Sequence, residues 1–449
     1  MRAFPRRQRG QIIVLVALSI FVLLSTVALA LDAGLSYTVK AKLNAATDAA
    51  SLAAARAVSH GDGEAAQREN ARKAAQRFFD ANFPATYMLS TATMNEPVIT
   101  FDPDGKVTVD ITASAAMPIS LLGVVNSTPL APGALTRTER KDLDMVLVMD
   151  TSGSLKGSAK SVRASGISFL NKFNTTQDRV GLLRFSYGAV VDDPISTSDR
   201  GFDLASMVGH ITNYQFDGST ASAEGMWNAR DQLNKIPAGN KRSNLRVIVF
   251  FSDGAPNSFG SYFEFKNPED CKRAGTIATG DATSAHYPIG LYYIDRIATP
   301  LPGGCTPDRY TPLTSLIAKL PDWYNAHNTK QEFRIVTDSP REVTSDVSNE
   351  TVAWRNVNRA ARNLAEAIAS KARDERIYVF TLGLGSQLKA GTGPDNENGE
   401  DVLKCMANTP DSGCFKAGQP VGVYCYAATD NDLTPCFSKL ASAILRISK

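Results

Sequence analysis

Small oxygen-bearing side chains follow directly on an unbroken apolar run at residues 145–149. Asp150, Ser152 and Ser154 alternate along one short stretch. A carboxylate and two hydroxyls on a tight turn are oxygen ligands of the kind that hard cations prefer, and Mg²⁺ fits best because it retains several waters. Ca²⁺ and Mn²⁺ are the alternatives. A cation held by so few carboxylates keeps much of its charge, so it can accept one more oxygen from an acidic side chain of a protein partner.

A second acid ends another apolar run. Residues 245–251 lead into Asp253 as residues 145–149 lead into Asp150. Such runs predict strands buried on both faces, and the C-terminal ends of parallel strands share one edge of a sheet. We therefore expect the two acids to lie close together at that edge. Thr220, just ahead of an expected helix, adds a third hydroxyl.

Asp217 is a competing acid in the Thr220 segment. It opens the sequence Asp-Gly-Ser-Thr, in which Thr220 is the last residue. Two roles remain open for its carboxylate: contact with the cation through a water molecule, or capping of the helix that follows.

The two strands belong to a longer alternating pattern. Further apolar runs at residues 180–185 and 377–382 predict two more strands. Strands that alternate with helices predict an α/β fold, here a doubly wound and mostly parallel sheet over residues 141–449. Apolar residues at helical spacing predict the helices at 159–173, 223–233, 356–373 and 433–447.

A long insertion, at about residues 256–350, follows Asp253 directly. An unstructured loop of that length is unusual in a compact domain. Because it leaves from the Asp253 loop, it must begin on the cation face. Two interpretations remain open: a subdomain that flanks the cation and selects the partner, or a solvated decoration.

The N-terminus contains an uncharged apolar stretch at residues 12–31, long enough for a membrane-spanning helix. The preceding tail, residues 1–11, contains four arginines, and Asp32 directly follows the apolar stretch. The positive-inside rule predicts a single-pass protein of the inner (cytoplasmic) membrane, with its C-terminal domain periplasmic or extracellular. A cleaved secretory signal is the alternative, with Ala28-Leu29-Ala30 as its small-x-small cleavage site.

Residues 32–140 are expected to form a helical stalk followed by a β-hairpin region. Alanine-rich helical spacing predicts that the membrane helix continues to residue 58 and that a second helix covers 64–79. Residues 129–141 contain prolines, a glycine and mixed charges, so we expect a linker there.

The β-hairpin is predicted from two short β-prone runs, 98–101 and 107–111, around a Pro-Asp-Gly turn. Asp102 and Asp104 resemble calcium ligands in type. Turn chemistry explains both residues more simply.

All six cysteines lie in the second half of the chain. Downstream of a membrane segment, an even and scattered set indicates disulfides in an oxidising compartment, whereas buried free thiols of a cytosolic protein are the alternative. Six cysteines allow fifteen connectivities. Proximity in the sequence favours the pairs Cys271–Cys305, Cys405–Cys414 and Cys425–Cys436.

Composition argues against several classes of function. The 48 Lys and Arg residues nearly balance the 45 Asp and Glu residues, so no basic footprint for nucleic acid is expected. Only four histidines and no Cys-x-x-Cys pair argue against a zinc site. Neither a phosphate-binding glycine loop nor a nucleophile elbow stands in a convincing context, so we expect a binding protein rather than an enzyme. A metal-dependent hydrolase remains the catalytic alternative.

The oxygen-bearing residues resemble the metal-ion-dependent adhesion site of von Willebrand factor A domains. That family's pattern is Asp-x-Ser-x-Ser, a distant Thr and a distant Asp. By position, Asp150, Ser152 and Ser154 match the first loop, Thr220 the second and Asp253 the third. The resemblance implies a metal-dependent protein-binding domain.

The N-terminal segment is similar to TadE/TadG-like Flp pilus-assembly proteins, through the run LDAGLSYTVKAKLNAATDAASLAAARA. Gly10 before the apolar run also resembles a prepilin processing site. Leu15 stands where such sites carry Glu, so we expect an uncleaved anchor. The resemblance implies a part in assembly, anchoring or adhesion of Flp (tight-adherence) pili. A pilus-independent membrane-tethered adhesin or scaffold is the alternative.

Overall fold

The computed structural model divides the chain into two compact units, Met1–Arg140 and Lys141–Lys449. The residues that the structure describes are 11–58, 64–101, 107–118, 129–140, 142–237, 242–243, 245–267, 269, 271–280, 291–305 and 312–447.

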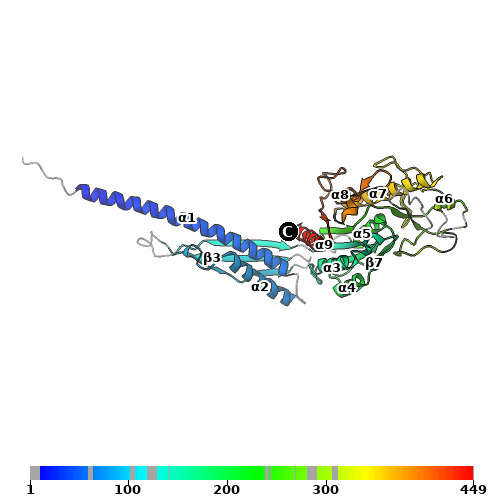
Figure 1. The fold of residues 1–449 in the computed structure, drawn as a ribbon. Helices are drawn as coiled ribbons and strands as arrows, with labels where there is room; N and C mark the ends of the chain where they lie inside the picture. The colour runs from blue at the N-terminus through cyan, green and yellow to red at the C-terminus, as the bar shows by residue number, and fades with distance from the viewer. Residues whose placement is uncertain are drawn as a thin grey trace, which may run out of the picture. The chain divides into compact units, whose positions relative to one another are not determined.

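The first unit packs two helices on an antiparallel sheet (Figure 1). Strand β3 pairs with β1 and β2 along one side and with β4 along the other. Val39 and Leu43 of α1 are buried with Val109 and Ile111 of β3 in one apolar core. The elements are α1 (Gln11–Ala57), α2 (Glu64–Asn82), η1 (Tyr87–Leu89), β1 (Thr91–Met94), β2 (Val98–Phe101), β3 (Val107–Ala116) and β4 (Gly133–Arg140).

Helix α1 joins the apolar stretch and the alanine-rich segment in one continuous helix, as its helical spacing predicted. Ile12, Leu15 and Phe21 in its N-terminal half are 59–68% exposed, whereas Val39 and Leu43 in its C-terminal half are fully buried. Among the residues described, this is the one helix long and apolar enough to cross a membrane. The predicted transmembrane helix is therefore supported by length, composition and exposure.

Strand β4 lies where the sequence predicted a linker. The linker expected at residues 129–141 is wrong, because Gly133–Arg140 forms strand β4. Its side chains alternate between exposed and partly buried, and this two-residue period was hidden by the prolines before it. The predicted hairpin partners do pair, as β2 and β3, but the turn with Asp102 and Asp104 lies outside the described residues.

The second unit is built on a six-stranded sheet in the order β16-β13-β8-β5-β6-β7. All neighbours are parallel except β6 and β7, so the predicted doubly wound and mostly parallel sheet is confirmed. The central strands β5 and β8 are buried along their whole length, which explains the apolar runs 145–149 and 247–251 within them. The strands are β5 (Leu143–Asp150), β6 (Arg179–Phe185), β7 (Ala189–Asp193), β8 (Leu245–Ser252), β13 (Ile377–Leu384) and β16 (Tyr424–Ala427).

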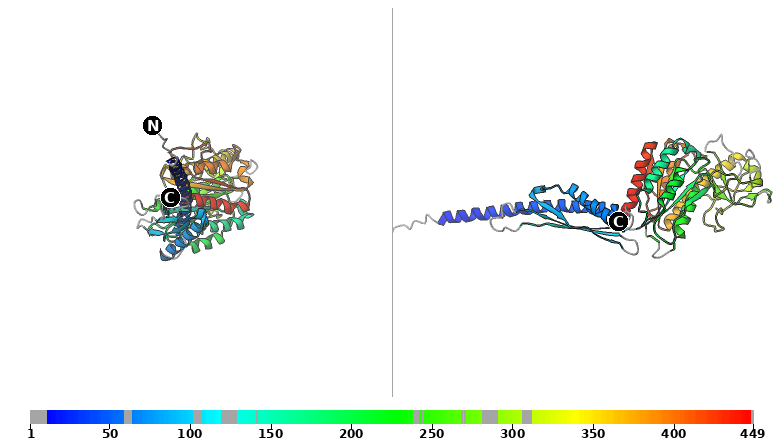
Figure 2. Two further views of the ribbon diagram at one scale, coloured as in Figure 1. Left: turned by 90° about the vertical axis from the view of Figure 1, so that its left-hand side faces the viewer. Right: turned by 90° about the horizontal axis from the view of Figure 1, so that it is seen from below.

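Helices cover both faces of this sheet (Figure 2). Met145, Leu147 and Met149 of β5 join the apolar core beneath α3, α4 and α9, whereas Val146 and Val148 join the core beneath α5, α7 and α8. The helices are η3 (Gly153–Lys156), α3 (Ala159–Leu170), α4 (Leu204–Thr212), α5 (Ser222–Lys235), α7 (Glu350–Asp374), η5 (Ser386–Lys389), α8 (Gly399–Ala407) and α9 (Asp430–Ile447).

The insertion after Asp253 shares the core of the domain. Phe259, Leu291 and Ile335 are buried in the same apolar cluster as α5 and α7. The insertion is therefore a packed part of this layer rather than a solvated decoration. Its elements are β9 (Ser258–Ser261), β10 (Glu264–Phe265), β11 (Gly275–Ala278), η4 (Gly303–Cys305), α6 (Leu313–Leu316) and β12 (Ile317–Lys319), and the short pair β14 (Gly391–Thr392) and β15 (Glu397–Asn398) follows α7.

Candidate metal centre

The ends of two central strands bring the first two acids together. Strands β5 and β8 are parallel neighbours, with Met149 opposite Phe251. Asp150 is the last residue of β5, and Asp253 comes one residue after the end of β8. Both acids therefore lie at the C-terminal edge of the sheet, as their sequence positions predicted.

Hydrogen bonds join the first loop to the second acid. Ser154 Oγ donates to Asp253 Oδ1 at 2.9 Å, and Ser152 Oγ lies 3.1 Å from Ser154 Oγ and 3.5 Å from Asp253 Oδ1. The backbone N–H of Ser152 donates to Asp150 Oδ1 at 2.7 Å. Four of the five expected donors thus share one cluster.

Thr220, the fifth expected donor, reaches this cluster through the loop ahead of α5. The Gly153 N–H donates to the Gly218 carbonyl at 3.1 Å, which ties the Thr220 loop to the first loop. The Thr220 hydroxyl lies beside Gly254, 3.7 Å from the position that a Cβ atom on that glycine would occupy. All three loops therefore meet at the sheet edge.

Gly218 is required where these loops meet. Its φ is +91°, in the left-handed region that favours glycine. A Cβ atom at this position would lie 2.2 Å from Ser186 Oγ and 2.6 Å from Tyr187 Cδ2. The close approach of the Thr220 loop thus depends on the missing side chain.

Two buried carboxylates give the site its electrostatic character. Asp150 is fully buried and Asp253 is 7% exposed. Burial raises the pKa of Asp150, and hydrogen bonds from Ser252 and Ser152 oppose that rise. Burial raises the pKa of Asp253 too, and the nearby charge of Asp150 raises it further. A bound cation would offset the cost of holding both groups ionised.

The donor set fits a hard divalent cation. Two carboxylates and three hydroxyls are oxygen donors throughout, and Ser154 is exposed, so the cluster is open to solvent on that side. Within the described ranges no group of three or more His, Cys, Asp and Glu residues could hold a metal. Any cation here must therefore rely on hydroxyl donors as well as on the two acids.

The Asp217 carboxylate lies in an exposed ion pair, and its contact with a cation through a water molecule stays a prediction. Its carboxylate pairs with Lys156 Nζ at 3.2 Å, and both side chains are about two-thirds exposed. The capping role is wrong, because the N-cap of α5 is Ala221. The Asp217 backbone has a structural part instead, since its N–H donates to the Thr151 carbonyl at 2.9 Å.

Comparison with protein families places these loops in a known domain. Residues 144–280 match the von Willebrand factor type A domain, and residues 10–57 match the Flp pilus-assembly TadE/G-like family. The chain carries a von Willebrand factor type A domain. Both families named from the sequence are thereby confirmed, whereas the five metal ligands stay a prediction. None of the curated proteins with which the chain was compared matches it.

Several solved structures are similar to the chain at low sequence identity. The pilus adhesin SpaC from Lactobacillus rhamnosus GG is 15% identical with a TM-score of 0.40, over 82% of this chain and 37% of that chain. The chain thus spans little more than a third of that adhesin. The PilB minor pilin from Streptococcus sanguinis is 13% identical with a TM-score of 0.37, over 80% of this chain and 79% of that chain. The vWF domain of the type V pili tip protein Mfa5 from Porphyromonas gingivalis is 18% identical with a TM-score of 0.38, over 69% of this chain and 97% of that chain.

Two residues of the von Willebrand factor type A domain escaped the sequence analysis. Ser252 Oγ donates to Asp150 Oδ2 at 2.6 Å, so it fixes the acid from the neighbouring strand. Its place directly before Asp253 was the available signal. Asn257 holds the backbone of Thr220 through its side chain, at 2.9 Å. No local pattern marks Asn257, because its partner is distant in the sequence.

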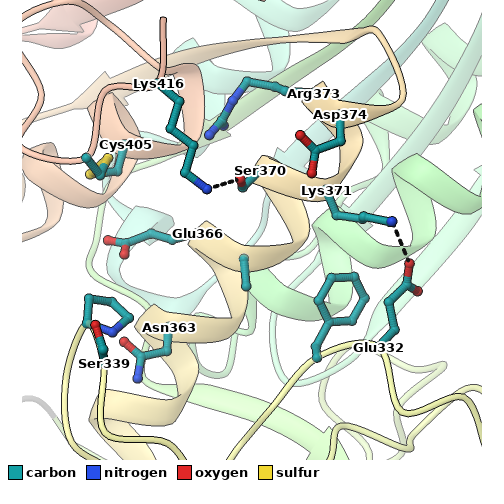
Figure 3. A pocket seen from close by; sticks show the side chains of 14 residues that line it. Glu332, Ser339, Asn363, Glu366, Ser370, Lys371, Arg373, Asp374, Cys405 and Lys416 are labelled. Atoms are coloured by element: carbon teal, nitrogen blue, oxygen red, sulfur yellow. Dashed lines mark hydrogen bonds and ion pairs between the residues drawn. A yellow bond between two sulfur atoms is a disulfide. The ribbon is translucent and has the colours of Figure 1, made fainter. Parts of the chain in front are cut away.

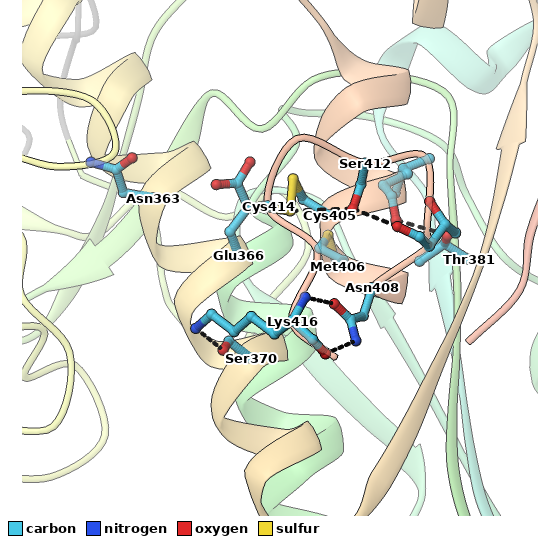
Figure 4. Close-up of a disulfide and its surroundings, with 12 residues drawn as sticks. Asn363, Glu366, Ser370, Thr381, Cys405, Met406, Asn408, Ser412, Cys414 and Lys416 are labelled. Carbon is cyan, nitrogen blue, oxygen red and sulfur yellow. Dashed lines mark hydrogen bonds between the residues drawn. A yellow bond between two sulfur atoms is a disulfide. The ribbon is translucent and has the colours of Figure 1, made fainter. Parts of the chain in front are cut away.

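The cysteines of the domain form three disulfides, in the pairs that sequence proximity favoured. The free-thiol alternative is wrong, since no free cysteine remains. Figure 4 shows the Cys405–Cys414 bridge, which joins α8 to the loop that follows it. In that loop Asn408 exchanges two hydrogen bonds with the backbone of Lys416. The bridge closes a loop against α7, to which Lys416 Nζ is bonded at Ser370 Oγ.

A cavity of about 510 Å³ adjoins this bridge (Figure 3). Its lining comes from α7, the insertion and the Cys405–Cys414 loop, and does not include the candidate metal ligands. Lys371 pairs with Glu332, and the Glu366 carboxylate accepts two hydrogen bonds from Arg341. The charged residues that line the cavity are of both signs.

Proposed function

We propose that the chain is a membrane-anchored component of Flp (tight-adherence) pilus assembly, anchoring or adhesion that binds a protein partner through a divalent cation. The observation that carries this proposal is the meeting of three loops at the sheet edge. They bring Asp150, Ser152, Ser154 and Asp253 into one hydrogen-bonded cluster with Thr220 beside it. The TadE/G-like segment supports the pilus context.

The five residues would hold the cation, and we propose Mg²⁺, with Ca²⁺ or Mn²⁺ as alternatives. When bound, the ion supplies an incompletely neutralised charge that accepts a carboxylate oxygen of the partner. The buried carboxylates of Asp150 and Asp253 provide the charge that retains it. The solvent-exposed Ser154 marks the side from which a partner can approach. This is a binding role and needs no chemical step.

We assign the parts of the chain accordingly. Residues 1–11 are the cytoplasmic tail, 12–31 cross the inner membrane and 32–140 are the stalk region. Residues 141–449, with the insertion at about 256–350, are the binding domain. The exposed apolar half of α1 supports the anchor, and the three disulfides support a periplasmic or extracellular domain.

The test is capture of isolated pilus-assembly components by the full chain in detergent. Capture is expected with Mg²⁺, and loss is expected with chelator or in Asp150→Ala. Asp411→Ala is the matched control, because Asp411 is an exposed acid that pairs with Lys404 on the surface. Capture that survives both chelation and Asp150→Ala would overturn the metal-dependent mechanism.

A further inference from the structure

The insertion begins with a residue that clamps the second metal loop. Asn257 Oδ1 accepts hydrogen bonds from the Thr220 N–H at 2.9 Å and from Ser219 Oγ at 2.5 Å. The Asn257 N–H donates in turn to the Thr220 carbonyl at 3.2 Å. Both peptide groups of Thr220 are thus held by one residue, which is 8% exposed.

A second attachment lies one helical turn further on. Glu224 of α5 is fully buried. Its Oε1 accepts from the Gly260 N–H and the Tyr324 hydroxyl, each at 2.7 Å, and its Oε2 lies 2.7 Å from His327 Nε2. All three partners belong to the insertion. A buried carboxylate is costly unless such bonds satisfy it, so the start of α5 is firmly tied to the insertion.

We propose that the insertion is a structural part of the metal centre and that Asn257 is the positioning residue that holds Thr220 for coordination. This inference rests on the proposed cation site. Residues that orient metal ligands contribute to affinity although they do not touch the ion. Coupling of this kind is reciprocal, so metal binding must also stabilise the insertion strand β9.

The experiment measures Mn²⁺ affinity of the full chain in detergent by electron paramagnetic resonance. Asn257→Ala removes both acceptor bonds, and the dissociation constant is expected to rise about 10- to 100-fold. Asn257→Asp keeps an oxygen that can accept both bonds, so affinity is expected to return towards that of the wild type.

Asn325→Ala is a closely matched control. Asn325 Oδ1 also accepts from one hydroxyl and one backbone N–H, those of Ser261 and Tyr262, at 2.7 and 2.8 Å. Those partners lie at the far end of β9 rather than in the metal loop. This variant is expected to lower the melting temperature in chelator much as Asn257→Ala does, while Mn²⁺ affinity stays unchanged.

Hydrogen exchange in the wild type provides a readout that needs no variant to fold. Mn²⁺ is expected to slow amide exchange in β9 together with the Thr220 segment. Unchanged exchange in β9, or equal Mn²⁺ affinity in Asn257→Ala and wild type, would overturn the inference while the cation site stands. A wild type that binds no Mn²⁺ would overturn the proposed function and this inference together.

Discussion

Replacement of Asp253 by Asn should stabilise the metal-free protein while abolishing its response to metal. In the absence of a cation, the charges of Asp150 and Asp253 oppose each other in a buried site. Asn is nearly isosteric, and its Oδ1 can still accept the hydrogen bond from Ser154. The substitution therefore removes a buried charge at little cost in packing or hydrogen bonding.

The size of the effect follows from the carboxyl groups themselves. A rise of one in the pKa of a carboxyl group means that the folded protein disfavours its charged form by about 1.4 kcal/mol more. Burial and the like charge of Asp150 both raise the pKa of Asp253. A gain of about 1–3 kcal/mol is therefore expected for the metal-free variant above neutral pH. For a domain as large as Lys141–Lys449 this is a rise of about 1.5 °C per kcal/mol in the melting temperature. The wild type should gain about 2.7 kcal/mol at a Mg²⁺ concentration 100 times its dissociation constant.

The assay is thermal unfolding of the full chain in detergent, with chelator and with Mg²⁺. Asp253→Asn should unfold at a higher temperature than wild type in chelator and show no increase with Mg²⁺. Asp411→Asn, an exposed acid, is the control and should behave as wild type in both conditions. A variant that is less stable in chelator and still gains stability with Mg²⁺ would refute the reasoning.

Three further outcomes are expected. Because burial raises the pKa of Asp150 and Asp253, the folded metal-free protein binds protons more tightly than the unfolded chain. Its melting temperature should therefore fall as the pH rises from about 3.9, the ordinary pKa of an Asp carboxyl group, towards the raised pKa values of the two acids. Over the same pH range the affinity for Mg²⁺, measured by titration calorimetry, should rise. Gly218→Ala places a Cβ atom against Ser186 at a residue with positive φ. The variant should lose about 1–3 kcal/mol in its free energy of unfolding and bind Mg²⁺ more weakly. Unchanged stability and Mg²⁺ binding would contradict the loop geometry. Deletion of residues 1–31 should move the protein from the membrane to the soluble fraction after cell lysis, and retention in the membrane would contradict the anchor.

The central sheet could be predicted because burial on both faces leaves a strong mark in the sequence. Strands β5, β8 and β13 are almost wholly buried, so apolar residues dominate each of them. Edge strands lack this mark. Strand β7 is mostly half-buried and ends in two acids, and β16 alternates, so neither was identified. Strand β4 was mistaken for a linker for the same reason.

The candidate site was predictable where it depends on strand ends and not where it depends on distant partners. Asp150 and Asp253 each follow a recognisable strand, so their meeting follows from the parallel sheet. The bond from Ser252 to Asp150 joins residues 102 positions apart. Asn257 acts on Thr220, 37 positions away. Such contacts are set by tertiary packing. The local sequence carries no signal for Asn257, and for Ser252 its place directly before Asp253 is the one signal.

Anomalous diffraction from crystals of the protein grown with Mn²⁺ would test the central claim most directly. One strong peak is expected at the C-terminal edge of the sheet, within about 2.0–2.6 Å of oxygen atoms from the Asp150 loop, the range for hard cations in proteins. Thr220 or Asp253 should complete the shell, directly or through water. An Mn²⁺ peak found only elsewhere, with these side chains still bonded to one another, would contradict the account.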